Sequence, residues 1–192
     1  MEKTPRLQAF QRPLSLLNLC KISLLNAQRD LPLSLDLVRK VVSFLLVELK
    51  ITTDEIIIHF VTESKICALH KEYFNDPSPT DCITFPIDPF NLEKDCVNLP
   101  SPTAFSRLKK KDKIFHILGE AFICPKTAFK YAKRHGIDPH TECYRYIIHC
   151  LLHLIGYNDL NPADRVKMKR KEKSCLTRLM SFLALLPNSF AP

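Results

Sequence analysis

The segment HCLLHLIGYND, residues 149–159, places two histidines four positions apart in an apolar run that favours a helix. Positions i and i+4 of a helix lie on one face, so His149 and His153 can reach the same metal ion. Gly156 can then end the helix in a left-handed turn and return Asp159 toward that ion as a third ligand. Three protein ligands leave a coordination position open for water, which is the arrangement of a catalytic zinc site.

Two other interpretations of this segment are possible. Two hydrogen-bonded histidines of a buried helix would show the same spacing, but the turn glycine and the position of Asp159 favour a metal site. A zinc metalloprotease would carry a glutamate directly after its first histidine as general base, and Cys150 stands there instead. The segment therefore predicts a metal centre with His149, His153 and Asp159 as ligands, and it disfavours a protease.

Strand patterns alternate with helix patterns along the rest of the chain. Ser34 is a candidate N-cap for an amphipathic helix through Lys50, and the β-branched run 56–61 indicates a buried strand. His59 within that run is expected to be a core residue with satisfied hydrogen bonds rather than a ligand. About four strands and their helices predict a single α+β or α/β domain. The other predicted strands lie at 14–22, 82–85 and 114–123, and the other helices follow Thr62, Cys124, Asp138 and Asn161, the last running to about Leu183.

The predicted domain covers residues 14–185. It lies between an N-terminal tail at 1–13, expected to be flexible, and a C-terminal tail at 186–192. A loop insert at about 88–113 ends in a lysine-rich run, which is either a solvated face or a contact for phosphate.

Composition narrows the class of protein. The 192 residues carry a net charge of +8 with a pI near 9.1, which favours a polyanionic partner such as nucleic acid, with a basic surface that binds nothing as the alternative. Eight cysteines without a CxxC pair indicate small buried residues in a reducing compartment rather than a disulfide framework. Since neither a secretory signal nor a membrane-spanning run is visible, a cytoplasmic protein is expected.

Four blocks of sequence, in order, match one known pattern. Residues 149–159 match H-G-x-L-H-L-x-G-Y-D-H, and residues 73–86, YFNDPSPTDCITFP, match Y-R-x-K-D-x-P-T-D-V-L-S-F-P. Residues 118–120 match L-G-D with glutamate in the last position, and Met168 and Glu172 form the fourth block in the last helix. These blocks, which span roughly residues 50–185, resemble the YbeY (UPF0054) family.

The resemblance implies a zinc-dependent endoribonuclease, specific for single-stranded RNA, that acts in 16S rRNA 3′-end maturation and ribosome quality control in the bacterial cytoplasm. Its implied partners are single-stranded RNA, the 16S rRNA and the small ribosomal subunit, without a membrane. The implied fold is α+β, a small mixed sheet of about four strands flanked by helices, with a zincin-like metal helix. One Zn²⁺ ion at the predicted ligands would assist phosphodiester hydrolysis, and Thr80, Asp81 and Thr84 would line the RNA groove.

Two departures from the family pattern bear on activity. Asp159 stands where the family has its third histidine, and a carboxylate shifts metal preference toward oxygen-loving ions. Phe74 stands where the family has an arginine implicated in RNA cleavage, which removes a cation for the phosphate. Arg145, one helical turn before His149, is a candidate replacement and is assigned to the groove. The alternatives are a non-catalytic ribosome-assembly or RNA-binding protein that retains the fold, and a structural metal site that pins the last helix to the sheet.

Overall fold

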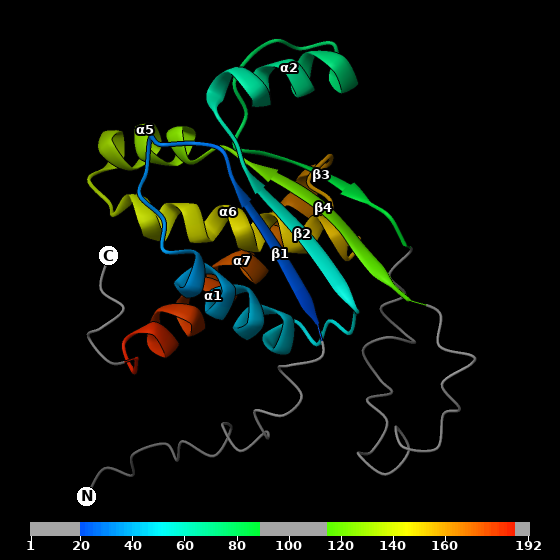
Figure 1. Cartoon of the computed structure of the whole chain (residues 1–192), viewed down its shortest axis with the longest axis vertical. Coiled ribbons are helices and arrows are strands. Elements are labelled where there is room, and N and C mark those ends of the chain that lie inside the picture. Colours follow the sequence, from blue (N-terminus) through cyan, green and yellow to red (C-terminus); the bar gives the residue numbers. More distant parts are fainter. Residues whose placement is uncertain (1–19, 89–114, 187–192) are drawn as a thin grey trace, which may run out of the picture.

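The computed structural model describes residues 20–88 and 115–186, which contain a four-stranded sheet and five helices (Figure 1). The strands are β1 (Lys21–Asn26), β2 (Glu55–Phe60), β3 (Cys82–Pro86) and β4 (Ile117–Ile123). The helices are α1 (Leu35–Glu48), α2 (Glu63–Phe74), α5 (Pro125–His135), α6 (Pro139–Leu154) and α7 (Pro162–Leu183).

The sheet is mixed. Its strand order is β1-β2-β4-β3, in which β2 pairs in parallel with both β1 and β4, while β3 runs antiparallel to β4 at one edge. The predicted α+β class with a small mixed sheet and flanking helices is confirmed.

One strand differs from its predicted position. The apolar run at 14–22 was predicted as the first strand, whereas β1 lies at Lys21–Asn26 and residues 14–19 fall outside the described part of the chain. β1 is an edge strand, which needs to bury only one face, and Ile22 is its one buried residue. In the sequence, a strand with one apolar face has a weaker hydrophobic pattern than the continuous apolar run before it. This explains why the first strand was predicted too early in the chain.

Helices α1 and α6 pack on the sheet, and α7 packs against these two helices to complete the core (Figure 1). Alternate residues of β2, Ile56, Ile58 and Phe60, are buried against that layer, as the period of two in a strand requires. Gly119 in β4 permits close approach, because a Cβ atom there would lie 2.5 Å from the carbonyl oxygen of Phe85 and 2.7 Å from Leu154 at the end of α6. The sheet and the last turn of α6 are thus held together beside the predicted metal ligands.

Local sequence signals set the ends of the helices. The side chains of Ser34, Asp138 and Asn161 accept hydrogen bonds from backbone N–H groups in the first turns of α1, α6 and α7, as predicted. Gly136 ends α5 in the left-handed conformation, and Gly156 follows the end of α6 with a φ of 92°.

The predicted tails and the loop insert lie almost entirely in residues 1–19, 89–114 and 187–192, outside the described part of the chain. Within the described part, no helix is both long and apolar enough to cross a membrane.

Candidate metal centre

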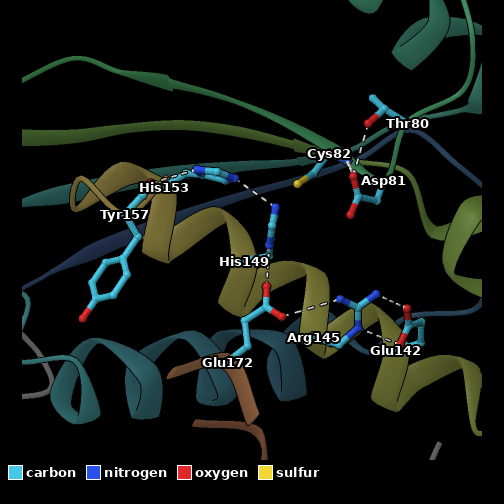
Figure 2. A network of polar contacts seen from close by, with 9 residues as sticks. All are labelled: Thr80, Asp81, Cys82, Glu142, Arg145, His149, His153, Tyr157 and Glu172. Atoms are coloured by element: carbon cyan, nitrogen blue, oxygen red, sulfur yellow. Dashed lines mark hydrogen bonds and ion pairs between the residues drawn. The ribbon is translucent and has the colours of Figure 1, made fainter. Parts of the chain in front are cut away.

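Two histidines of α6 point at each other across one turn of the helix (Figure 2). The Nε2 atoms of His149 and His153 are 2.9 Å apart, and the planes of the two rings are nearly perpendicular. Both rings are partly buried between α6 and the sheet. The predicted helical spacing therefore brings two imidazole nitrogens to the same point.

The other nitrogen of each ring has a partner that fixes its orientation. The Nδ1 of His153 donates to the backbone oxygen of Tyr157 at 3.0 Å, and the Nδ1 of His149 contacts a carboxylate oxygen of Glu172 in α7. Since both partners accept a hydrogen bond from Nδ1, each Nε2 is left to face the shared point. Metal-binding histidines commonly have this arrangement, in which a carboxylate or carbonyl holds the second nitrogen.

The two histidines differ in their affinity for a proton. Burial opposes the charge on His149, but the hydrogen bond with Glu172 and the nearby charges of Asp81 and Asp159 outweigh it and raise its pKa. Burial and the charge of His149 lower the pKa of His153. Of the two rings, His149 therefore has the greater affinity for a proton.

Asp159 joins this pair. The ligand atoms of Asp159, His149 and His153 all lie within 4.8 Å of one another. Two donors bound to one zinc ion at about 2.0–2.2 Å are separated by at most about 4.4 Å, so small side-chain movements suffice to share an ion. Two imidazoles and one carboxylate are an established catalytic zinc ligand set. The three predicted ligands fit a metal ion.

A second group of potential ligands adjoins the first. Asp81, Cys82 and His149 also place their ligand atoms within 4.8 Å of one another. The carboxylate of Asp81 accepts hydrogen bonds from the hydroxyl of Thr80 at 3.2 Å and from the backbone N–H of Cys82 at 3.0 Å. Thr84, also assigned to the groove, is half-buried in β3 and shares the strand face of Cys82, because alternate residues of a strand point the same way.

A cavity of about 300 Å³ opens beside these ligands. Three cationic side chains and two carboxylates contribute to its wall. The lining residues are Arg145, His149, Asp159, Arg165, Met168, Lys169 and Glu172.

The comparisons with known proteins identify the family. A family model described as Endoribonuclease YbeY matches residues 24–180. The chain belongs to the YbeY endoribonuclease family. A protein named Endoribonuclease YbeY from Protochlamydia amoebophila (strain UWE25) is 40% identical over 154 residues, covering 80% of this chain and 89% of that protein. One from Chlamydia felis is 38% identical over 169 residues, covering 86% and 95%. The solution structure of TM1509 from Thermotoga maritima shares the fold with a TM-score of 0.55 at 18% identity, covering 88% of this chain and 96% of that one.

Arg145, predicted to replace the arginine of the YbeY pattern, is held by carboxylates. Its guanidinium donates two hydrogen bonds to Glu142 and lies 3.7 Å from an oxygen of Glu172 (Figure 2). The hydrogen bond and charge of Glu142 raise the pKa of Arg145. Arg145 thus reaches the cavity with much of its charge compensated, while Phe74 is 59% exposed on α2 and does not line the cavity.

Sequence reasoning missed two residues of the centre, Glu172 and Cys82. Glu172 appeared only as part of a family block, without a role. A signal was available, because the buried residues of α7 are Met168, Glu172, Cys175 and Leu179, a stripe with helical spacing that contains one charged residue. A carboxylate on such a stripe requires a buried partner, which here is His149.

The prediction for His59 was wrong in one respect. Its Nε2 is buried and has no hydrogen-bond partner among the described residues, and a carboxylate oxygen of Glu120 lies 3.6 Å away. The ring stacks on Phe122 at a centroid distance of 4.3 Å. His59 belongs to neither group of potential metal ligands among the described residues, but its hydrogen bonds are not satisfied.

Proposed function

We propose that this chain is a zinc-dependent endoribonuclease that cuts single-stranded RNA. Family membership supports the class of enzyme, and the relatives named above are endoribonucleases. The observation that carries the proposal is the convergence of His149, His153 and Asp159, with the Nδ1 atoms of both rings held by fixed partners.

In this proposal His149, His153 and Asp159 hold one Zn²⁺ ion. When bound, the ion acidifies water or polarises a phosphate oxygen. Glu172 orients His149, and the backbone oxygen of Tyr157 orients His153. The negative charge of Asp159 makes the ligand set harder than three histidines would be.

The cations of the cavity would bind the RNA backbone. Within the described part of the chain, Arg165 donates only to the backbone oxygen of Asp159, at 3.2–3.3 Å, and Lys169 forms no ion pair. Both side chains are therefore better placed than Arg145 to bind phosphate, since two carboxylates compete for the Arg145 guanidinium. Thr80, Asp81 and Thr84 would line the groove on the opposite side of the ion.

The cellular role that we propose is 16S rRNA 3′-end maturation and ribosome quality control in the bacterial cytoplasm, on the small ribosomal subunit. The net charge of +8 suits an RNA partner. Affinity for RNA that falls as salt concentration rises would agree with backbone contacts.

The second candidate is a non-catalytic RNA-binding or ribosome-assembly protein. Phe74, in place of the arginine of the family pattern, favours it, because no cation stands at that position. Binding to the small ribosomal subunit without turnover of RNA under any divalent metal would support this candidate. If the missing cation limits a weak activity, Phe74→Arg should raise cleavage without changing metal content.

The deciding experiment is metal analysis paired with cleavage of single-stranded RNA by wild type and His153→Ala. We expect the variant to lose cleavage together with the zinc ion that His149, His153 and Asp159 hold. His140→Ala is the matched control, since His140 lies in the first turn of the same helix and contacts the backbone oxygen of Pro32. Equal cleavage by metal-free wild type would overturn the proposed mechanism.

A further inference from the structure

Cys82 lies at the start of β3, on the face that looks toward α6. The next residue, Ile83, packs on the opposite face into the cluster beneath α2 with Ile66 and Leu69. Because a strand alternates its side chains, Cys82 faces α6, where its thiol meets that of Cys150. The antiparallel pairing of Cys82 with Ile123 fixes this position in the sheet.

The thiol approaches the same histidine nitrogen that faces His153. Glu172 occupies the Nδ1 of His149, so Nε2 is the ring atom left to bind a metal ion with Asp81 and Cys82 (Figure 2). The second group of ligands, Asp81, Cys82 and His149, therefore overlaps the first and shares only His149 with it. One nitrogen lone pair binds one ion at a time, so the two positions exclude each other.

We propose that Asp81, Cys82 and His149 form an alternative, thiolate-containing position for the metal ion, in competition with the position formed by His149, His153 and Asp159. The inference rests on the metal centre of the proposed function and extends it. As the S–metal bond forms, the S–H bond breaks and its proton leaves to solvent. A thiolate is a soft ligand, so thiophilic divalent ions such as Zn²⁺, Co²⁺ and Cd²⁺ would favour this position over Mg²⁺ or Mn²⁺.

The arrangement gives the site a means of selecting its metal. The position with Asp159 offers nitrogen and a hard carboxylate, whereas the position with Cys82 offers nitrogen, carboxylate and sulfur. The family pattern quoted above has valine where this chain has Cys82, a side chain without a ligand atom. Cys82→Val is therefore a suitable test variant, because valine is similar in shape to cysteine and has no ligand atom.

Co²⁺ titration tests the proposal, because a thiolate bound to Co²⁺ gives a sulfur-to-cobalt charge-transfer band in the near ultraviolet, separate from the visible bands of the ion. We expect wild type to show this band with one ion per chain. Cys82→Val should lose the band and still bind one Co²⁺, now at the position with Asp159. Asp159→Ala should keep it.

Cys150→Ala is the matched control, since it removes the neighbouring thiol and should leave the band in place. Thermal melting of each variant checks folding, and Cys82→Ala serves if Cys82→Val is unstable. A wild-type complex with visible cobalt bands but no sulfur band, a band that survives Cys82→Val, or two ions bound at once would overturn the inference. Failure of wild type to bind Co²⁺ at all would instead contradict the metal centre of the proposed function.

Discussion

The two halves of α6 each carry a close pair of side chains. One pair is self-sufficient, whereas the other requires a proton or a metal ion between its two members. Near the start, Glu142 and Arg145 are three residues apart and carry opposite charges that satisfy each other. Near the end, His149 and His153 are four residues apart, and their Nε2 atoms meet at 2.9 Å. Two imidazole nitrogens can share a point only with a proton or a metal cation between them.

The difference separates a structural pair from a binding pair on one helix. Glu142 is only 3% exposed, and its charge is balanced by Arg145 of the same helix, so the start of α6 requires no bound ion. At the histidine end, a metal ion would take the place of the proton that the close approach of the two Nε2 atoms requires. Glu172 in α7 touches both ends, since it contacts His149 and lies 3.7 Å from Arg145. Substitutions that change stability at the Glu142–Arg145 end without changing zinc binding at the histidine end, or the reverse, therefore test this difference.

The largest effect on stability is expected for Arg145→Ala. It leaves the buried carboxylate of Glu142 without its cation, which should lower the free energy of unfolding by about 3 kcal/mol. Zinc content should stay near that of wild type, because the histidine pair is untouched. Urea denaturation and metal analysis of the same samples would measure both quantities.

Arg39→Ala is the matched control for that substitution. Arg39 pairs with Asp36 at the same three-residue spacing, at 3.3 Å on the exposed face of α1. Exposed pairs contribute little, so the control should change stability by at most about 0.5 kcal/mol. Similar losses in the two variants would show that the Glu142–Arg145 pair is not a buried structural contact.

The next effect in size concerns Glu172, which connects the two ends. Glu172→Ala removes the acceptor that orients His149, and such outer partners typically account for about 10–100-fold in metal affinity. We expect zinc affinity, measured by competition with a chelating dye, to fall within that range. Glu172→Gln keeps an acceptor for Nδ1 and should lose less.

Glu48→Ala controls for loss of a carboxylate that packs against α7. Glu48 of α1 pairs with Arg178 of α7, away from the cavity. It should leave zinc affinity unchanged. Unchanged affinity in Glu172→Ala as well would mean that Glu172 does not orient the metal ligand.

The sequence predicted those parts of the centre that depend on short-range geometry. The spacing of His149 and His153 and the turn at Gly156 need only helical periodicity and a cap, so both were predictable together with Asp159. Glu172 and Cys82 come from other elements, α7 and β3, and they reach His149 only because those elements pack against α6. Such contacts depend on tertiary packing, and this also explains why the edge strand β1 was misplaced by the apolar run beside it.

The smallest effect is expected at Asp138, the N-cap of α6, and it depends on pH. Its carboxylate accepts hydrogen bonds from the backbone N–H of Thr141 at 2.6 Å and from the hydroxyl of Thr141 at 2.8 Å. Burial opposes the charge, but these hydrogen bonds and His140 outweigh it and hold the pKa of Asp138 below its usual value of 3.8. A depressed pKa stabilises the fold above that value, and the contribution disappears as pH falls through the lower, folded-state pKa.

At neutral pH, Asp138→Ala should therefore cost about 1 kcal/mol of stability, the usual effect of losing a cap. Asp138→Asn keeps a good capping group and should cost less. Because the amide does not titrate, its stability relative to wild type should rise as the pH is lowered through the region below 3.8, where wild type loses the benefit of its ionised cap. Thermal melts of the three proteins across this range would measure the change. A wild-type advantage over Asp138→Asn that grows toward low pH has the wrong sign for an ionised cap. It would show that the ionised carboxylate of Asp138 does not stabilise the start of α6.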